Sequence, residues 1–197
     1  PALIVERFDR KQLADGRMTR IHQEDCAQAL GLAPERKYAT QSSPKKSDPA
    51  FIRIASALVR YAPGDVNDQI LRLFDQMVVN VALGNTDAHA KNYSLLHATP
   101  QTVSLAPMYD VVPAMEITPG IRHMGMRIAN QIAIDKVGRD ELLAEGASWG
   151  LRRDVLVKRL NEDLLKLVEG IERVRDEYPQ AARRHEKPAL DRIEQMR

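Results

Sequence analysis

The chain contains 197 residues, of which 44% are hydrophobic and 28% charged, and its 29 Lys and Arg against 27 Asp and Glu give a formal net charge of +2. This composition is typical of a globular protein of one large domain or two small ones, and it excludes general disorder and a protein that mainly coats nucleic acid. The single cysteine, Cys26, excludes an internal disulfide, and no apolar run reaches the length of about 20 residues that spans a bilayer. Because the first residues also lack the pattern of a signal peptide, we expect a cytoplasmic protein without a membrane contact.

The first quarter of the chain begins with a predicted strand over residues 2–8, which contains the run Leu-Ile-Val. The pair Asp15-Gly16 is a turn signal and predicts a hairpin that returns through 18–21. A short helix is expected over 23–30, followed by a polar loop over 34–49. Because the first strand has no preceding partner, we expect the chain to be a piece of a longer protein.

Helical patterns dominate the remainder of the chain. Ile70, Phe74, Met77 and Val81 recur at helical spacing within 65–83, and this wide apolar face predicts a helix that is buried on several sides. Similar patterns predict helices over 51–61, 139–149, 152–178 and 188–196, and short strands over 94–97, 103–106 and 124–128. The expected fold class is therefore mainly α with a small β component.

Charged side chains are scarce over 66–134 and frequent over 150–197. Ionised groups are costly in a buried region unless they are paired or bind a metal, so the few charged residues in the middle of the sequence are candidates for function. The segment 84–92 (GNTDAHAKN) is densely polar within this region, and its Asp87 and Asn92 enclose four residues. That is the spacing of the protein-kinase catalytic loop, in which the Asp accepts the substrate hydroxyl proton and the Asn holds Mg²⁺. Asp110 follows after the two short predicted strands, where a kinase has its second metal ligand.

Each of these residues also has a simpler interpretation. Asp, Asn and Gly are ordinary turn residues, and a D-x-x-x-x-N spacing arises by chance in many sequences. Asp110 is equally suited to cap a turn before Val111-Val112-Pro113, and a histidine such as His89 is commonly just hydrogen-bonded. The functional interpretation depends on the combination of loop position, apolar surroundings and spacing.

Four ordered sequence blocks resemble one known family. They are VERFDR (5–10), QEDCAQALG (23–31), GNTDAHAKNYS (84–94) and LAPMYDV (105–111). These blocks are similar to successive motifs of the HipA-family serine/threonine kinases, the toxin components of bacterial toxin–antitoxin modules. The resemblance covers residues 3–112 and implies a protein-kinase-like C-terminal lobe.

The resemblance implies roles for particular residues and the use of ATP and Mg²⁺. Asp87 would be the catalytic base, and Asn92 and Asp110 would be the Mg²⁺ ligands. The nucleotide-binding residues would fall into three groups, which include the two metal ligands: the interlobe hinge (Glu6, Arg7 and Phe8), the run that faces the phosphates (His89, Ala90, Lys91 and Asn92), and the other wall of the ATP site (Tyr109, Asp110, Val111 and Val112).

The resemblance also implies what this chain lacks. In the family, a Gly-rich loop, a strand lysine and an activation serine all precede the hinge, where this sequence begins. We therefore expect one domain that is a fragment of a longer kinase, with a hinge strand and hairpin over 1–21 and a helical lobe over 22–197. The fragment alone is expected to be inactive.

The family resemblance further implies partners and a cellular role. The phosphorylated target would be a protein serine, which in some members belongs to an aminoacyl-tRNA synthetase. A HipB-like DNA-binding antitoxin would bind the kinase and bring it near DNA, and the biological setting would be bacterial persistence.

Two other functions remain open from the sequence. A non-catalytic module that docks an antitoxin or DNA would use the cations Arg152, Arg153, Lys158 and Arg159, although a solvated helix face interleaved with carboxylates explains the same pattern. A metal hydrolase would use Asp87, His89, His97 and Asp110, but no further cluster at ligand spacing completes such a site.

Overall fold

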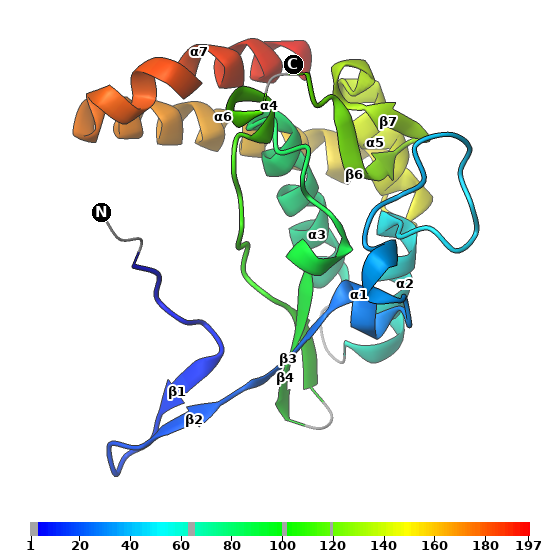
Figure 1. The fold of residues 1–197 in the computed structure, drawn as a ribbon, viewed down its shortest axis with the longest axis vertical. Helices are drawn as coiled ribbons and strands as arrows, with labels where there is room; N and C mark the ends of the chain where they lie inside the picture. The colour runs from blue at the N-terminus through cyan, green and yellow to red at the C-terminus, as the bar shows by residue number, and fades with distance from the viewer. Residues whose placement is uncertain (1–3, 63–65, 100–101, 119) are drawn as a thin grey trace.

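The computed structural model describes residues 4–62, 66–99, 102–118 and 120–197 (Figure 1). Its helices are α1 (Cys26–Ala29), α2 (Phe51–Tyr61), α3 (Val66–Ala82), α4 (Ala114–Ile117), α5 (Arg139–Ser148), α6 (Arg153–Glu177) and α7 (Pro179–Gln195). Its strands are β1 (Arg10–Gln12), β2 (Met18–Arg20), β3 (His22–Asp25), β4 (Ser94–Thr99), β5 (Thr102–Leu105), β6 (His123–Ile128) and β7 (Gln131–Ala133). The expectation of a mainly α fold with a small β component is confirmed. No helix within these ranges is long and apolar enough to cross a membrane.

The strands form three small antiparallel sheets, ordered β1-β2, β3-β4-β5 and β6-β7. In Figure 1 the β1–β2 hairpin extends away from the helical body, whereas α6 and α7 run side by side at one end of it. Strand β5 of the three-stranded sheet packs against α3, and β4 follows the loop over 84–92.

Helix α3 is the centre of the hydrophobic core. Leu73, Phe74, Met77 and Val78 are fully buried, and the helix packs against α2, α6 and α7. Each such side chain contributes about 1.5–3 kcal/mol when it is transferred from water to the interior. The predicted helix over 65–83 is therefore confirmed within the described residues, and position 65 lies outside them.

An aromatic cluster connects the core to β4, the strand that follows the loop over 84–92. The ring centroid of Phe51 lies 5.4 Å from that of Tyr93 and 5.9 Å from that of Trp149. Tyr93 immediately precedes β4 and is almost completely buried. Such aromatic contacts fix the exit of the loop on a rigid support.

The N-terminal prediction is wrong in part. Residues 4–8 form no strand, and residues 1–3 lie outside the described ranges. The chain instead turns around the buried carboxylate of Asp9, which accepts hydrogen bonds from the guanidinium groups of Arg7 and Arg10. The predicted hairpin is confirmed but begins at β1, and Gly16 in its turn has a φ of 83°.

Two further elements differ from the sequence-based expectation. Residues 22–25 form β3, which pairs with β4, so the predicted helix over 23–30 is reduced to α1. Asp25 caps this short helix, and its carboxylate accepts a hydrogen bond from the backbone N–H of Gln28. Helix α7 begins at Pro179 and not at Pro188 as expected. Pro179 lies in its first turn, where a proline is favourable, and Pro188 lies inside the helix.

Candidate functional site

The polar loop over 84–92 begins where Gly84 ends α3. Gly84 has a φ of 68°, which a residue with a side chain rarely adopts. The guanidinium group of Arg192, on α7, covers this glycine and donates a hydrogen bond of 3.0 Å to the carbonyl of Ala82. The same group lies 3.5 Å from the carboxylate of Glu116, on α4. The end of α3 is therefore held by the last helix of the chain.

Three buried polar side chains fix the first part of the loop. The side-chain amide of Asn85 donates to Asn80 Oδ1 over 2.7 Å, and the amide of Asn80 donates to the hydroxyl of Tyr93 over 3.1 Å. Buried polar groups of this kind are stable only when they are hydrogen-bonded. This network ties the loop to α3 and to the start of β4.

Asn85 also connects the loop to the segment that contains Asp110. Its Oδ1 accepts a hydrogen bond of 3.2 Å from the backbone N–H of Asp87, and its Nδ2 lies 3.4 Å from the carbonyl of Asp110. At the other end of the loop, Asn92 Nδ2 donates to Asp110 Oδ2 over 3.1 Å. The three residues singled out by sequence spacing are thus joined in one hydrogen-bonded site.

Asp110 has a backbone conformation that is uncommon for its residue type. Its φ of 56° lies in the left-handed region, which Asp adopts at a cost of about 1–3 kcal/mol when held by its surroundings. Its carboxylate is exposed and meets the Asn92 amide. The strain is therefore stored at the position where the two segments meet.

Asn92 and Asp110 have the donor chemistry of a magnesium site. Because the Asn92 amide nitrogen donates to Asp110, its oxygen is oriented away from that carboxylate, and an amide oxygen beside a carboxylate is the hard donor set that Mg²⁺ prefers. Two protein ligands suffice for Mg²⁺, which usually retains waters and binds substrate phosphates.

A hydrolase metal centre finds no such support. His97 lies on β4, where its ring centroid is 5.0 Å from that of His22 with the two planes tilted, and its Nε2 lies 3.4 Å from the carboxylate of Glu24. Across the part of the chain that the structure describes, no three His, Cys, Asp or Glu residues are grouped so that they could hold a metal ion.

His89 is a buried, neutral residue in the middle of the loop. It is 5% exposed, and Lys37 Nζ lies 2.7 Å from its Nε2. A lysine ammonium can only donate, so Nε2 accepts and the ring proton resides on Nδ1, which is buried without a partner among the described residues. Burial and the Lys37 charge both lower the pKa of His89, against the carboxylates of Asp87 and Asp110.

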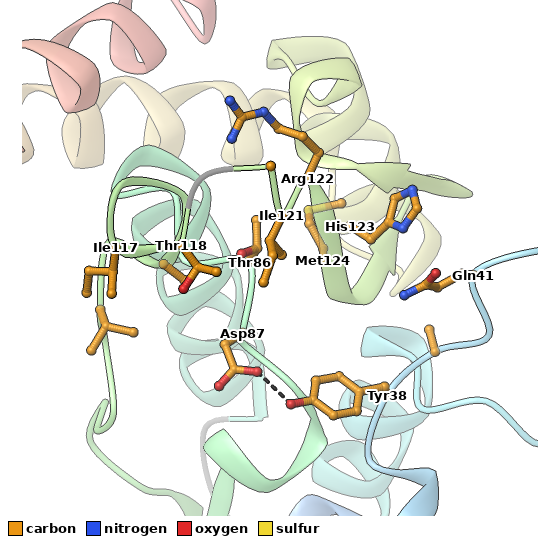
Figure 2. Close-up of a pocket in the computed structure, with 14 residues that line it drawn as sticks. Tyr38, Gln41, Thr86, Asp87, Ile117, Thr118, Ile121, Arg122, His123 and Met124 are labelled. Carbon is orange, nitrogen blue, oxygen red and sulfur yellow. Dashed lines mark hydrogen bonds between the residues drawn. The ribbon is translucent and has the colours of Figure 1, made fainter.

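Tyr38 contacts the candidate base directly. Its hydroxyl donates a hydrogen bond of 2.7 Å to Asp87 Oδ1 (Figure 2). Its ring meets that of His89 edge-on at a centroid distance of 4.9 Å. Burial and this hydrogen bond raise the pKa of Tyr38 to about 12. Sequence reasoning missed both Lys37 and Tyr38, because they lie in a polar loop whose pattern gives no sign of a contact with a distant part of the chain.

A guanidinium clamp holds the segment that follows Tyr38. Arg127, on β6, donates hydrogen bonds of 2.7 Å to the carbonyl of Thr40 and 2.9 Å to that of Ser42. The carboxylate of Asp48 accepts from the hydroxyl and backbone N–H of Thr40 at 2.7 and 3.1 Å. The loop over 34–49 is therefore held in place and forms part of the site together with the loop over 84–92.

The residues predicted to bind the nucleotide are distributed over several environments. The Tyr109 hydroxyl donates to the carbonyl of Lys91 over 2.5 Å, and its ring centroid lies 6.0 Å from that of Phe8. Burial raises the pKa of Tyr109 to about 12. The remaining predicted residues are placed as follows: Glu6 is exposed, Arg7 pairs with Asp9, the backbone N–H of Ala90 donates to the Lys37 carbonyl, Val111 is half-buried, and Val112 lines a cavity.

That cavity has a volume of about 720 Å³ and borders Asp87 on the side of the 112–124 segment (Figure 2). Its lining is mainly apolar and includes Val112, Ile121 and Met124. Thr86 also lines it and is 3% exposed, with a hydroxyl that has no hydrogen-bond partner in the described residues. A pocket of this size and character is typical of ligand sites.

The four cations considered for DNA contact all have carboxylate neighbours. The pairs are Arg152 with Asp154 at 2.6 Å, Arg153 with Asp140 at 3.7 Å, Lys158 with Glu162 at 3.9 Å and Arg159 with Asp75 at 2.5 Å. Arg159 joins α6 to α3, which indicates a role in packing. DNA contact by these residues stays a prediction, and the geometry equally fits an ion-paired helix face.

Comparisons with known proteins agree with the motif blocks. A family model described as "HipA-like C-terminal domain" matches residues 1–176. A putative kinase, Y4mE, from Sinorhizobium fredii is 33% identical over 174 residues, which cover 88% of this chain and 40% of that protein. The serine/threonine-protein kinase toxin HipA from Shewanella oneidensis is 29% identical over 181 residues, which cover 88% of this chain and 41% of that protein.

A solved structure has the same fold. The HipA chain in a complex of HipA, HipB and operator DNA from Shewanella oneidensis matches with a TM-score of 0.81 and 24% identity. The match covers 97% of this chain and 47% of that chain. The chain therefore spans less than half the length of these three proteins.

Proposed function

The chain belongs to the family of HipA-like C-terminal domains, and we propose that it forms the C-terminal lobe of a serine/threonine kinase that transfers phosphate from Mg²⁺-ATP to a protein serine. The observation that carries this proposal is the position of Asn85, whose amide joins Asp87 to Asp110 while Asn92 bonds to Asp110. An acidic base and two hard oxygen donors on neighbouring segments are the parts that a phosphoryl-transfer site requires.

Asp87 acts in this proposal as the catalytic base. Its backbone is fixed by Asn85, and its carboxylate lies at the border of the cavity beside the loop. A carboxylate in this position orients the acceptor hydroxyl and accepts its proton. Such proton transfer increases the rate by a factor of about 10²–10⁴.

Asn92 and Asp110 hold the magnesium ion in the same proposal. When bound, Mg²⁺ supplies positive charge that neutralises the nucleotide phosphates. The part of this chain is to present one amide oxygen and one carboxylate from two segments whose separation is fixed by the Asn92–Asp110 hydrogen bond. The two side chains are therefore adjacent before the nucleotide binds, and rotation of the Asn92 amide would present its oxygen to an ion held by Asp110.

The adenine end of the nucleotide is assigned to the start of the chain. Phe8 and Tyr109 approach each other there, and we assign the backbone of Glu6, Arg7 and Phe8 to the hinge. In this arrangement residues 1–21 form the hinge and hairpin, and residues 22–197 form the helical lobe. The phosphate-binding parts that precede the hinge in HipA kinases would complete the site.

The proposed biological role is that of a toxin in a toxin–antitoxin module. The similar solved structure is a complex of HipA with HipB and operator DNA, which supports a HipB-like antitoxin and DNA as partners of the protein that contains this chain. Co-purification with the product of a neighbouring antitoxin gene tests this assignment. A protein that stays separate from that product in gel filtration contradicts it.

The test of the kinase activity is Asp87→Asn in the intact protein, measured by transfer of labelled γ-phosphate from ATP to protein serine. We expect transfer to fall at least 100-fold, with an unchanged circular dichroism spectrum. Asp191→Asn is the matched control, because Asp191 is an exposed residue of α7 that pairs with Lys187. Full activity of Asp87→Asn contradicts the proposed function.

A further inference from the structure

The Tyr38 hydroxyl occupies one oxygen of the Asp87 carboxylate, the group that the proposed function assigns to the acceptor. Its hydroxyl donates to Asp87 Oδ1 over 2.7 Å, while 45% of the residue is exposed to solvent (Figure 2). A hydroxyl that donates to this oxygen has the relation to the base that an acceptor serine requires. The two hydroxyls therefore compete for the same carboxylate.

The backbone around Tyr38 is held independently of this hydroxyl. The N–H of Ala90 donates to the carbonyl of Lys37 over 3.1 Å, and the N–H of Ala39 donates to the carbonyl of Gly125 over 2.8 Å. Neither bond involves the phenol group. The exposed side chain can therefore change rotamer and leave Asp87 while its backbone stays in place.

The cavity provides a path by which an acceptor reaches Asp87. Tyr38, Thr86 and Asp87 all line it, and the Thr86 hydroxyl is buried without a hydrogen-bond partner within the described ranges. A buried hydroxyl without a partner is costly, and a peptide backbone group is suited to satisfy it. The apolar side chains of Ile121 and Met124 give the same space a surface on which a peptide can pack.

We propose that the Tyr38 hydroxyl holds the acceptor position on Asp87, and that a serine-bearing peptide segment entering this cavity displaces it. This inference rests on the proposed kinase activity. In the reaction, the serine oxygen forms a bond to the γ-phosphorus of ATP, the bond from that phosphorus to the bridging oxygen breaks, ADP leaves, and the serine proton passes to Asp87. In this proposal Tyr38 leaves Asp87 Oδ1 before the serine hydroxyl donates to that oxygen.

The test is Tyr38→Phe in the intact kinase, with Tyr178→Phe as the matched control because Tyr178 is an exposed tyrosine at the α6–α7 junction. The acceptor is the peptide that the wild type phosphorylates best in a randomised serine-peptide library. We expect Tyr38→Phe to lower the KM for this peptide about threefold to tenfold, which corresponds to about 0.7–1.4 kcal/mol. The KM for ATP and the kcat should change less than twofold.

A second measurement uses water as the acceptor. Tyr38→Phe opens Asp87 Oδ1 to water, and we expect the hydrolysis of ATP without peptide to increase at least threefold. A lower kcat at unchanged peptide KM would mean that the hydroxyl positions Asp87, and this result overturns the inference. An unchanged or higher peptide KM overturns it as well. A wild-type protein without phosphoryl transfer would contradict the proposed function itself, and the displacement with it.

Discussion

The side-chain amide of Asn92 donates a hydrogen bond of 3.1 Å to the carboxylate of Asp110. The contact joins the loop after α3 to the segment after β5 and holds the Asn92 amide beside the Asp110 carboxylate. A cation that binds both residues would find the two side chains already adjacent, and rotation of the Asn92 amide would turn its oxygen toward that cation.

The first prediction concerns this pair. Asp110→Asn removes the negative charge while keeping the size of the side chain, so we expect the Mg²⁺ concentration for half-maximal phosphoryl transfer to increase at least tenfold. A magnesium titration of the intact enzyme at saturating ATP measures this change. Asp176→Asn, an exposed residue near the end of α6, is the control. An unchanged magnesium requirement in Asp110→Asn would remove Asp110 from the metal site.

The second prediction concerns the buried amide of Asn85. Asn85→Ala leaves Asn80 Oδ1 without its donor and releases the backbone of Asp87. We expect a loss of about 1–3 kcal/mol in the free energy of unfolding, as is usual for an unsatisfied buried group. Urea denaturation of the chain measures the stability. Phosphoryl transfer in the intact protein should fall at least tenfold, and wild-type activity in this variant would show that Asn85 does not position the base.

The third prediction concerns the close approach of β6 to the loop. A Cβ atom at Gly125 would lie 2.7 Å from the backbone of Ala88 and His89, and backbone atoms cannot move aside as a flexible side chain can. We expect Gly125→Ala to lower the free energy of unfolding by about 1–3 kcal/mol. Gly170→Ala, in α6, is the matched control, because nothing lies within 4 Å of its added Cβ. The free energy of unfolding of that control should increase by about 0.5–1 kcal/mol. Equal effects of the two substitutions would contradict the steric explanation.

The fourth prediction concerns the pH dependence of stability at the α3–α6 contact. Burial, followed by the neighbouring charge of Asp75, raises the pKa of Asp163 to about 7. The folded state then binds a proton that the unfolded state releases near pH 4, so the free energy of unfolding decreases through this group as pH increases from about 4 to about 7. Asp163→Asn removes this penalty. We therefore expect the melting temperature of the variant minus that of the wild type to increase as the pH increases from about 4 to about 7. A difference that stays constant from pH 4 to pH 8 would contradict the assignment.

Local sequence signals were sufficient for the elements that depend on local forces. The apolar spacing of Phe74, Met77 and Val81 predicts α3 to within a residue at its C-terminal end, since a helix buries its face through neighbours three and four positions apart. The spacing of Asp87 and Asn92 is likewise a local signal, because the short loop over 84–92 carries both residues. Gly84 predicts the end of the helix for the same local reason.

These local signals could not predict contacts between segments that are far apart in the sequence. Strand β3 is short and is stabilised by pairing with β4, which lies in a distant segment of the sequence. The contact of Tyr38 with Asp87 depends on how an irregular loop is clamped by Arg127, which no periodic pattern reports. The start of α7 was missed because Pro188 normally indicates a helix boundary.

The contact of Arg192 with Gly84 bears on where this protein can be shortened. The family match ends at residue 176, yet the cation that covers the end of α3 comes from position 192. A recombinant product that stops at the family boundary would leave the Ala82 carbonyl and the Glu116 carboxylate without their shared partner. A shortened chain that keeps this contact therefore extends through Arg192 of α7, beyond the end of the family match.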